Sequence, residues 1–134
     1  MIKTILSVED DSMTQLLNRI TLEDAGVCEQ IVEAYNGQEA LGIFEEIVSN
    51  KKIKKEVPEV ILLDLNMPVM GGWEFYENLK EKYKEIICMT KIFILTSSLN
   101  PEDKLRAEKE EYITDLIFKP LDDKNVSIIK NAFG

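Results

Sequence analysis

The sequence predicts an α/β fold: a doubly wound, five-stranded parallel sheet built from five strand–helix repeats, (βα)5, with helices on both faces. Two observations carry this prediction. Short, continuous apolar runs alternate along the chain with longer stretches whose apolar residues recur at helical spacing. Parallel strands joined by right-handed crossovers then place helices on both faces of one sheet. At 134 residues the chain has the size of one domain, and we assign residues 1–134 to it.

The first repeat begins with the apolar run 2–8, which predicts a strand. Asp11 or Ser12 follows as a candidate N-cap, because a short side chain with an oxygen atom can accept from the free amides of a helix start. Gly26 closes the connection after this helix. We expect the helix to bury one apolar face, formed by Met13, Leu16, Leu17 and Ile20.

The second repeat is a strand at 29–34, after which Asn36-Gly37 turns the chain into its helix. The expected buried face of that helix consists of Ala40, Leu41, Phe44, Ile47 and Val48. Residues 51–57 have no clear period and stop at Pro58, which predicts a loop. We interpret the basic cluster in this loop as a solvated surface; it consists of Lys51, Lys52, Lys54 and Lys55.

The third repeat starts at residues 60–63, an apolar run without alternation that is typical of a central parallel strand. Pro68 and Gly71-Gly72 then interrupt regular structure before the next helix. The remaining expected elements are helices at 73–82, 101–111 and 122–133 and strands at 92–95 and 116–118.

Composition argues against several classes of function. The formal charge of −9 argues against a nucleic-acid partner, which requires clustered Lys and Arg. We also expect no membrane partner and no signal peptide, because no apolar run approaches the roughly 18 residues of a membrane span. Two cysteines are too few for a disulfide scaffold, so we interpret Cys28 and Cys88 as reduced packing residues in a cytoplasmic protein.

Polar residues lie at the ends of four predicted strands. Glu9 and Asp10 follow the first strand and Asp64 the third, while Thr96 and Lys119 follow the fourth and fifth. The carboxyl ends of parallel strands share one edge of the sheet, so we expect these side chains in one crevice. Carboxylates brought together repel one another unless a cation lies between them. Oxygen ligands select a hard ion such as Mg²⁺.

The same set of residues suits phosphoryl transfer. A carboxylate such as Asp64 that attacks phosphorus forms an aspartyl phosphate. Mg²⁺, the ammonium group of Lys119 and the hydroxyl group of Thr96 would each stabilise one of the three equatorial oxygens. Each residue alone is a weak signal, but their order along five strand–helix repeats is far more specific.

Four segments resemble the motifs of response-regulator receiver domains, the CheY-like family: SVEDD, ILLDLNMPVMGG, FILTSS and IFKP. The resemblance spans essentially the whole chain and implies a stand-alone receiver domain with the flavodoxin-like strand order 2-1-3-4-5. It implies that Asp64 is phosphorylated from a phosphohistidine on a partner and that Mg²⁺ is bound by Glu9, Asp10, Asp64 and the backbone carbonyl of Asn66. Such a domain is not an enzyme beyond accepting and slowly releasing its own phosphoryl group.

The resemblance further implies that Thr96 moves toward the phosphoryl group, that Lys119 bridges to it, and that a cis bond precedes Pro120. The sequence contains no histidine, so we expect the donor in trans, as a sensor histidine kinase or a histidine phosphotransfer protein. The output would be phosphorylation-dependent binding to a protein target or to a second copy of this chain, in a bacterial cytoplasm.

The fifth strand departs from the family pattern. Leu116 occupies a position where the family often has an aromatic residue that turns inward with the hydroxyl residue. Phe118 would lie on the same side of an alternating strand, where a substitute role is conceivable and packing is the simpler use. Two alternatives stay open. One is a Mg²⁺-dependent phosphohydrolase of the haloacid-dehalogenase kind, which needs a second acid where Asn66 stands; the other is a scaffold that binds partners without phosphorylation.

Overall fold

The computed structural model describes residues 1–49 and 57–132, so the basic cluster at 51–55 and Phe133 lie outside the described residues. Its strands are β1 (Ile2–Val8), β2 (Cys28–Ala34), β3 (Val60–Leu63), β4 (Lys91–Thr96) and β5 (Ile113–Phe118). Its helices are α1 (Ser12–Ala25), α2 (Gly37–Ser49), α4 (Gly72–Lys82), α5 (Lys84–Ile87), α6 (Pro101–Lys109) and α7 (Asp123–Asn131). Within these ranges no helix has the length and apolar character that crossing a membrane requires.

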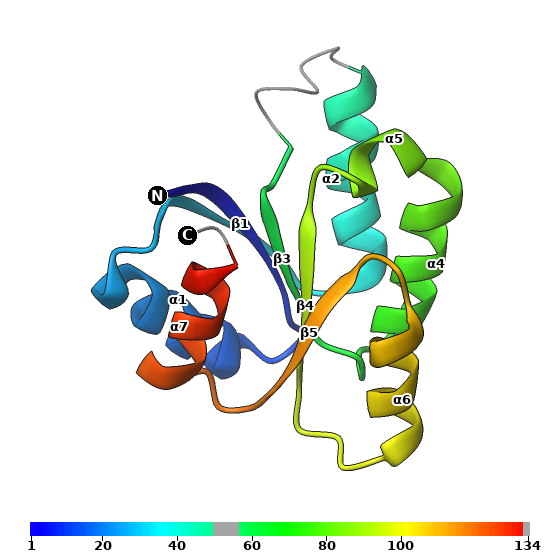
Figure 1. The fold of residues 1–134 in the computed structure, drawn as a ribbon. Coiled ribbons are helices and arrows are strands. Elements are labelled where there is room, and N and C mark those ends of the chain that lie inside the picture. The colour runs from blue at the N-terminus through cyan, green and yellow to red at the C-terminus, as the bar shows by residue number, and fades with distance from the viewer. Residues whose placement is uncertain (50–56, 133–134) are drawn as a thin grey trace.

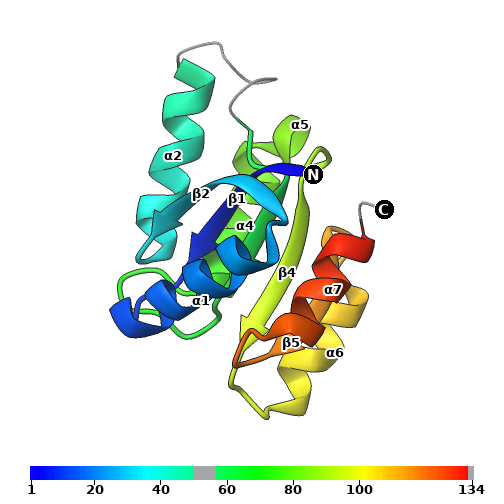
Figure 2. The same ribbon diagram turned by 90° about the vertical axis from the view of Figure 1, so that its left-hand side faces the viewer.

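The five strands form one parallel sheet in the order β2-β1-β3-β4-β5, which confirms the predicted fold and strand order. Helices α1 and α7 cover one face of the sheet, and α2, α4 and α6 cover the other (Figures 1 and 2). The chain is therefore doubly wound, and the carboxyl ends of all strands lie at the same edge of the sheet.

Strand β3 lies in the middle of the sheet and sends side chains into both layers of the core. All four of its residues are buried. Ile61 and Leu63 pack under α2 and α4, whereas Val60 and Leu62 pack under α1 and α7. Burial on both faces explains why this segment is apolar without alternation.

The predicted cap of the first helix is confirmed. The Asp11 carboxylate accepts a hydrogen bond from the backbone N–H of Thr14 at 2.9 Å. At the other end Gly26 adopts φ +62°, a left-handed conformation that glycine tolerates, and its N–H donates to the carbonyl of Glu23.

The predicted buried face of α1 is wrong. Its four apolar side chains are 45% to 60% exposed; they are Met13, Leu16, Leu17 and Ile20. The helix instead buries Gln15, Asn18 and Leu22. Backbone carbonyls at the carboxyl ends of β1 and β2 need hydrogen-bond donors at this place, and the side-chain amide of Gln15 supplies them. An apolar face turned inward would supply none of these hydrogen bonds.

Two packing predictions on single residues are also wrong. Val48, near the end of α2, is 40% exposed, because it lies at the margin of the face that buries Ala40, Phe44 and Ile47. Cys88 is exposed after α5, whereas Cys28 is half-buried and packs against the core as predicted.

The observed element boundaries differ most from the predicted ones in β5, which begins at Ile113 and not at residue 116. Thr114 and Asp115 are exposed and break the apolar run on which the prediction relied. The single helical turn α5, between α4 and β4, was not predicted, since a segment this short carries no readable period.

Candidate functional site

Three carboxylates meet where β1 and β3 end. Glu9, Asp10 and Asp64 each offer an oxygen atom, and these atoms all lie within 4.8 Å of one another. The neighbouring strands hold the backbone in place: the Asp64 N–H donates to the Val8 carbonyl, and the Glu9 N–H donates to the Ala34 carbonyl, both at 3.0 Å. Glu9 and Asp64 are buried, whereas Asp10 is exposed.

Lys119 brings a positive charge to this cluster from the end of β5. Its Nζ lies 2.5 Å from Glu9 Oε1 and 3.5 Å from Asp64 Oδ1. The Lys119 N–H donates to the carbonyl of Thr96 at 2.9 Å, which fixes the turn after β5 against the end of β4. The predicted cis bond between Lys119 and Pro120 is present.

The electrostatics of the cluster fit a divalent cation. Burial, followed by the charge of Glu9, raises the pKa of Asp64 from 3.8 to about 7, although Lys119 opposes this rise. Burial alone would lower the pKa of Lys119, but the hydrogen bond to Glu9 and the charge of Asp64 raise it overall. Three carboxylates facing one ammonium group leave an excess of negative charge. A divalent cation with oxygen ligands would balance that excess and favour the ionised form of Asp64.

Thr96 ends β4 one step further along the same edge. Leu63 of β3 pairs with Ile94 of β4, and Thr96 pairs with Phe118 of β5, so Thr96 lies between the strands that carry Asp64 and Lys119. It is fully buried, and its hydroxyl oxygen accepts a hydrogen bond from the Ser98 N–H at 3.0 Å. The hydroxyl hydrogen is then available to an anionic oxygen at the cluster.

The loop after β3 folds tightly over the end of that strand. The Asn66 N–H lies 3.4 Å from Asp64 Oδ1, so Asn66 is beside the cluster, and the role of its carbonyl as a metal ligand stays a prediction. A side chain on Gly72 would clash with the carbonyl oxygen of Asp64, which explains a glycine at the start of α4. Val69, in the same loop, adopts φ +67° and is 75% exposed.

Sequence reasoning missed Gln15, which supports the cluster from α1. Its Nε2 donates to the backbone carbonyls of Glu9 at 3.3 Å and of Ser7 and Ala34 at 3.1 Å. One side chain thus joins the ends of β1 and β2 and holds the backbone of Glu9. No signal in the sequence distinguishes this glutamine from an exposed one, because glutamine is common on solvent-facing helix surfaces.

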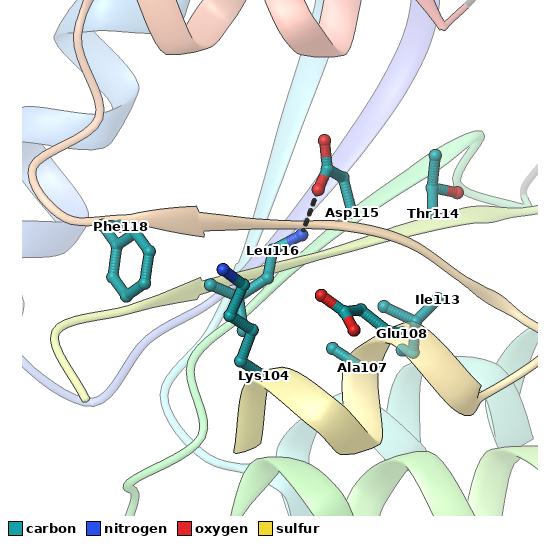
Figure 3. A pocket seen from close by; sticks show the side chains of 8 residues that line it. All are labelled: Lys104, Ala107, Glu108, Ile113, Thr114, Asp115, Leu116 and Phe118. Atoms are coloured by element: carbon teal, nitrogen blue, oxygen red, sulfur yellow. Dashed lines mark hydrogen bonds between the residues drawn. The ribbon is translucent and has the colours of Figure 1, made fainter. Parts of the chain in front are cut away.

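Leu116 and Phe118 both point from β5 toward α6, where they line a pocket of about 350 Å³ (Figure 3). The prediction that they share one side of the strand is confirmed. Leu116 is half-buried, and Phe118 is 46% exposed, so the aromatic ring is not packed into the core.

Comparison with known proteins identifies the family of this chain. The family model described as "Response regulator receiver domain" matches residues 5–129. An uncharacterised 14.6 kDa protein of Leptolyngbya boryana is 31% identical, over 88% of this chain and 79% of that protein. Two longer relatives are the sensor histidine kinase CheAY of Helicobacter pylori, 29% identical, and a protein-glutamate methylesterase/protein-glutamine glutaminase of Methanococcoides burtonii, 31% identical. The matches cover 87% and 98% of this chain but span only 13% and 33% of those two proteins.

Solved structures agree at the level of the fold. A two-component response regulator from Cytophaga hutchinsonii superposes with a TM-score of 0.89 at 25% identity, over 98% of this chain and 96% of that one. The chemotaxis response regulator CheY4 of Vibrio cholerae gives a TM-score of 0.72 at 27% identity, over 98% of both chains.

Proposed function

The chain belongs to the family of response regulator receiver domains, and we propose that residues 1–134 form such a domain and accept a phosphoryl group on Asp64 with the help of Mg²⁺. One observation carries this proposal. Asp64 is a buried carboxylate that ends the central strand, close to two further carboxylates and 3.5 Å from the ammonium group of Lys119. Its role as acceptor is supported by that position.

Each residue has a part in the transfer. Glu9, Asp10, Asp64 and the carbonyl of Asn66 would hold Mg²⁺, and the bound ion would supply positive charge to neutralise the phosphoryl oxygens. A carboxylate oxygen of Asp64 forms the new bond to phosphorus, while the bond between phosphorus and the donor imidazole nitrogen breaks and its electron pair stays on that nitrogen. Lys119 stabilises negative charge on one equatorial oxygen, and the Thr96 hydroxyl donates to another.

The donor is a separate histidine-bearing site. Receiver domains take phosphoryl groups from histidine kinases, and residues 1–134 contain no histidine. We therefore propose a sensor histidine kinase or a histidine phosphotransfer protein as the donor, acting in the cytoplasm. The output would be phosphorylation-dependent binding to a protein target or to a second copy of this chain.

Incubation with acetyl phosphate and Mg²⁺, followed by intact-mass measurement, tests the acceptor. We expect the wild type to gain one phosphoryl group and Asp64→Asn to gain none. Lys119→Ala should slow the gain by roughly 10²-fold, because it removes a fixed charge that stabilises the transition state. Asp115→Asn removes an exposed carboxylate on β5 outside the cluster and serves as the control with wild-type gain. An Asp64→Asn protein that gains the same phosphate would place the acceptor elsewhere.

A further inference from the structure

A line of hydrogen bonds runs from Thr96 at the sheet edge to Trp73 on α4, the one tryptophan of the sequence. We propose that Ser98 and Asp103 are positioning residues that couple the hydroxyl group of Thr96 to the indole of Trp73. The inference rests on the proposed function, because the phosphoryl group on Asp64 is what would attract the Thr96 hydroxyl.

The line consists of three hydrogen bonds. The Ser98 N–H donates to Thr96 Oγ1 at 3.0 Å, and Ser98 Oγ donates to Asp103 Oδ2 at 2.9 Å. The indole Nε1–H of Trp73 donates to the other carboxylate oxygen, Asp103 Oδ1, at 3.0 Å. Ser98, Asp103 and Trp73 are half-buried, where hydrogen bonds to a carboxylate are stronger than in water. One carboxylate therefore binds the loop after β4 with one oxygen and α4 with the other.

Neighbouring side chains hold the indole ring from other sides. The guanidinium carbon of Arg106 lies 4.3 Å from the ring centroid of Trp73, and the Arg106 Nη2 donates to Glu77 at 2.9 Å. Tyr76 meets the indole edge-on, with 6.0 Å between ring centroids. Because α4 and α6 both supply these neighbours, the surroundings of the indole change when α6 or the loop before it is displaced.

The coupling follows from the bonds that Ser98 makes with its main chain and its side chain. When the Thr96 hydroxyl is drawn toward a phosphoryl oxygen on Asp64, its Oγ1, which is the acceptor of the Ser98 N–H, moves with it. Ser98 Oγ is bound at the same time to Asp103, whose backbone is fixed in the first turn of α6. A shift of Ser98 therefore reaches the Asp103 carboxylate and, through it, the indole. This line reaches α4 without involving Leu116.

The indole N–H resonance of Trp73 provides the test, because one tryptophan gives one such signal in ¹H–¹⁵N NMR spectra. Beryllofluoride with Mg²⁺ is added as a mimic of the phosphoryl group. In the wild type we expect the indole resonance to shift in step with the backbone amides of Asp64 and Thr96. In Ser98→Ala the amide of Asp64 should still shift, while the indole resonance loses most of its response. Ser98→Thr keeps the hydroxyl group and should restore it.

Two further variants complete the design. Asp103→Asn offers one acceptor oxygen in place of two, so the indole response should also fall. Asp115→Asn is the matched control and should respond like the wild type. A full indole response in Ser98→Ala overturns the coupling. If the wild-type Asp64 amide responds and the Trp73 indole does not, this inference alone fails; if the Asp64 amide does not respond either, the proposed function fails with it.

Discussion

Val69 adopts a backbone conformation that is unfavourable for a residue with a β-branched side chain. A β-branched residue at φ +67° crowds its own backbone, and Val69 gains little from burial because it is 75% exposed. We expect Val69→Gly to raise the free energy of unfolding by about 1 kcal/mol, after the greater flexibility of glycine in the unfolded chain is subtracted. Urea unfolding would measure the change.

Val69→Ala is the matched control for this prediction. Alanine keeps the β-carbon but removes the branch, so its effect should lie between those of valine and glycine. A Val69→Gly protein that is less stable than the wild type would show that contacts of the valine side chain outweigh the strain of its backbone.

At the scale of elements, helix α1 shows that an apolar side chain on a helix is not necessarily buried. Leu17 is 54% exposed and Leu22 is fully buried, although both are leucines on one helix. Leu17→Ser should change the free energy of unfolding by about 0.5 kcal/mol or less, as exposed substitutions do. Leu22→Ala should lower it by about 2–5 kcal/mol, because it leaves a cavity between α1 and the sheet. Equal costs for both variants, measured by thermal or urea unfolding, would contradict this account.

The same helix shows what the sequence could and could not predict. The helix and its cap at Asp11 follow from local chemistry, which a linear pattern records. Which face of the helix turns inward depends on Gln15, whose three acceptors lie at the ends of β1 and β2, six or more residues away in the sequence. A helical apolar stripe carries no information about these acceptors. Strand β3 was predictable because a strand that is buried on both faces requires consecutive apolar residues, and β3 has four of them.

The candidate site was predictable for a related reason. Asp64, Thr96 and Lys119 stand directly at strand ends, and the parallel topology alone brings such positions to one edge. The hydrogen bond between Asp103 and Trp73 could not be predicted, because the two residues lie on different helices whose relative placement depends on side-chain packing.

For the molecule as a whole, the cluster of carboxylates lowers stability in the absence of metal. The folded-state pKa of Asp64 is raised above its unfolded value, so its contribution to stability is fully present below pH 3.8 and is lost as the pH rises through about 7. Asp64→Asn removes this charge. With EDTA at pH 8 we expect the variant to be more stable than the wild type by about 2 kcal/mol, a difference that shrinks toward acidic pH.

Adding Mg²⁺ should reverse the order, because the wild type binds the ion in its folded state and the variant has lost a ligand. Urea unfolding at several pH values, with and without Mg²⁺, measures both effects. Asp115→Asn, on an exposed part of β5, should show neither. An Asp64→Asn protein that is less stable than the wild type at pH 8 without metal would mean that the contact with Lys119 outweighs burial and repulsion.

The central position of β3 determines how fast its backbone amide hydrogens exchange with solvent. Its backbone amides are bonded between β1 and β4 and covered by both layers of helices, so their hydrogens exchange only when the whole domain unfolds. Strand β2 lies at an edge of the sheet and has half-exposed residues, so we expect its amide hydrogens to exchange sooner than those of β3. Asp64 is thus attached to the slowest-exchanging part of the molecule. Any response to its modification must be carried by the side chains and loops around it, while the strand beneath stays in place.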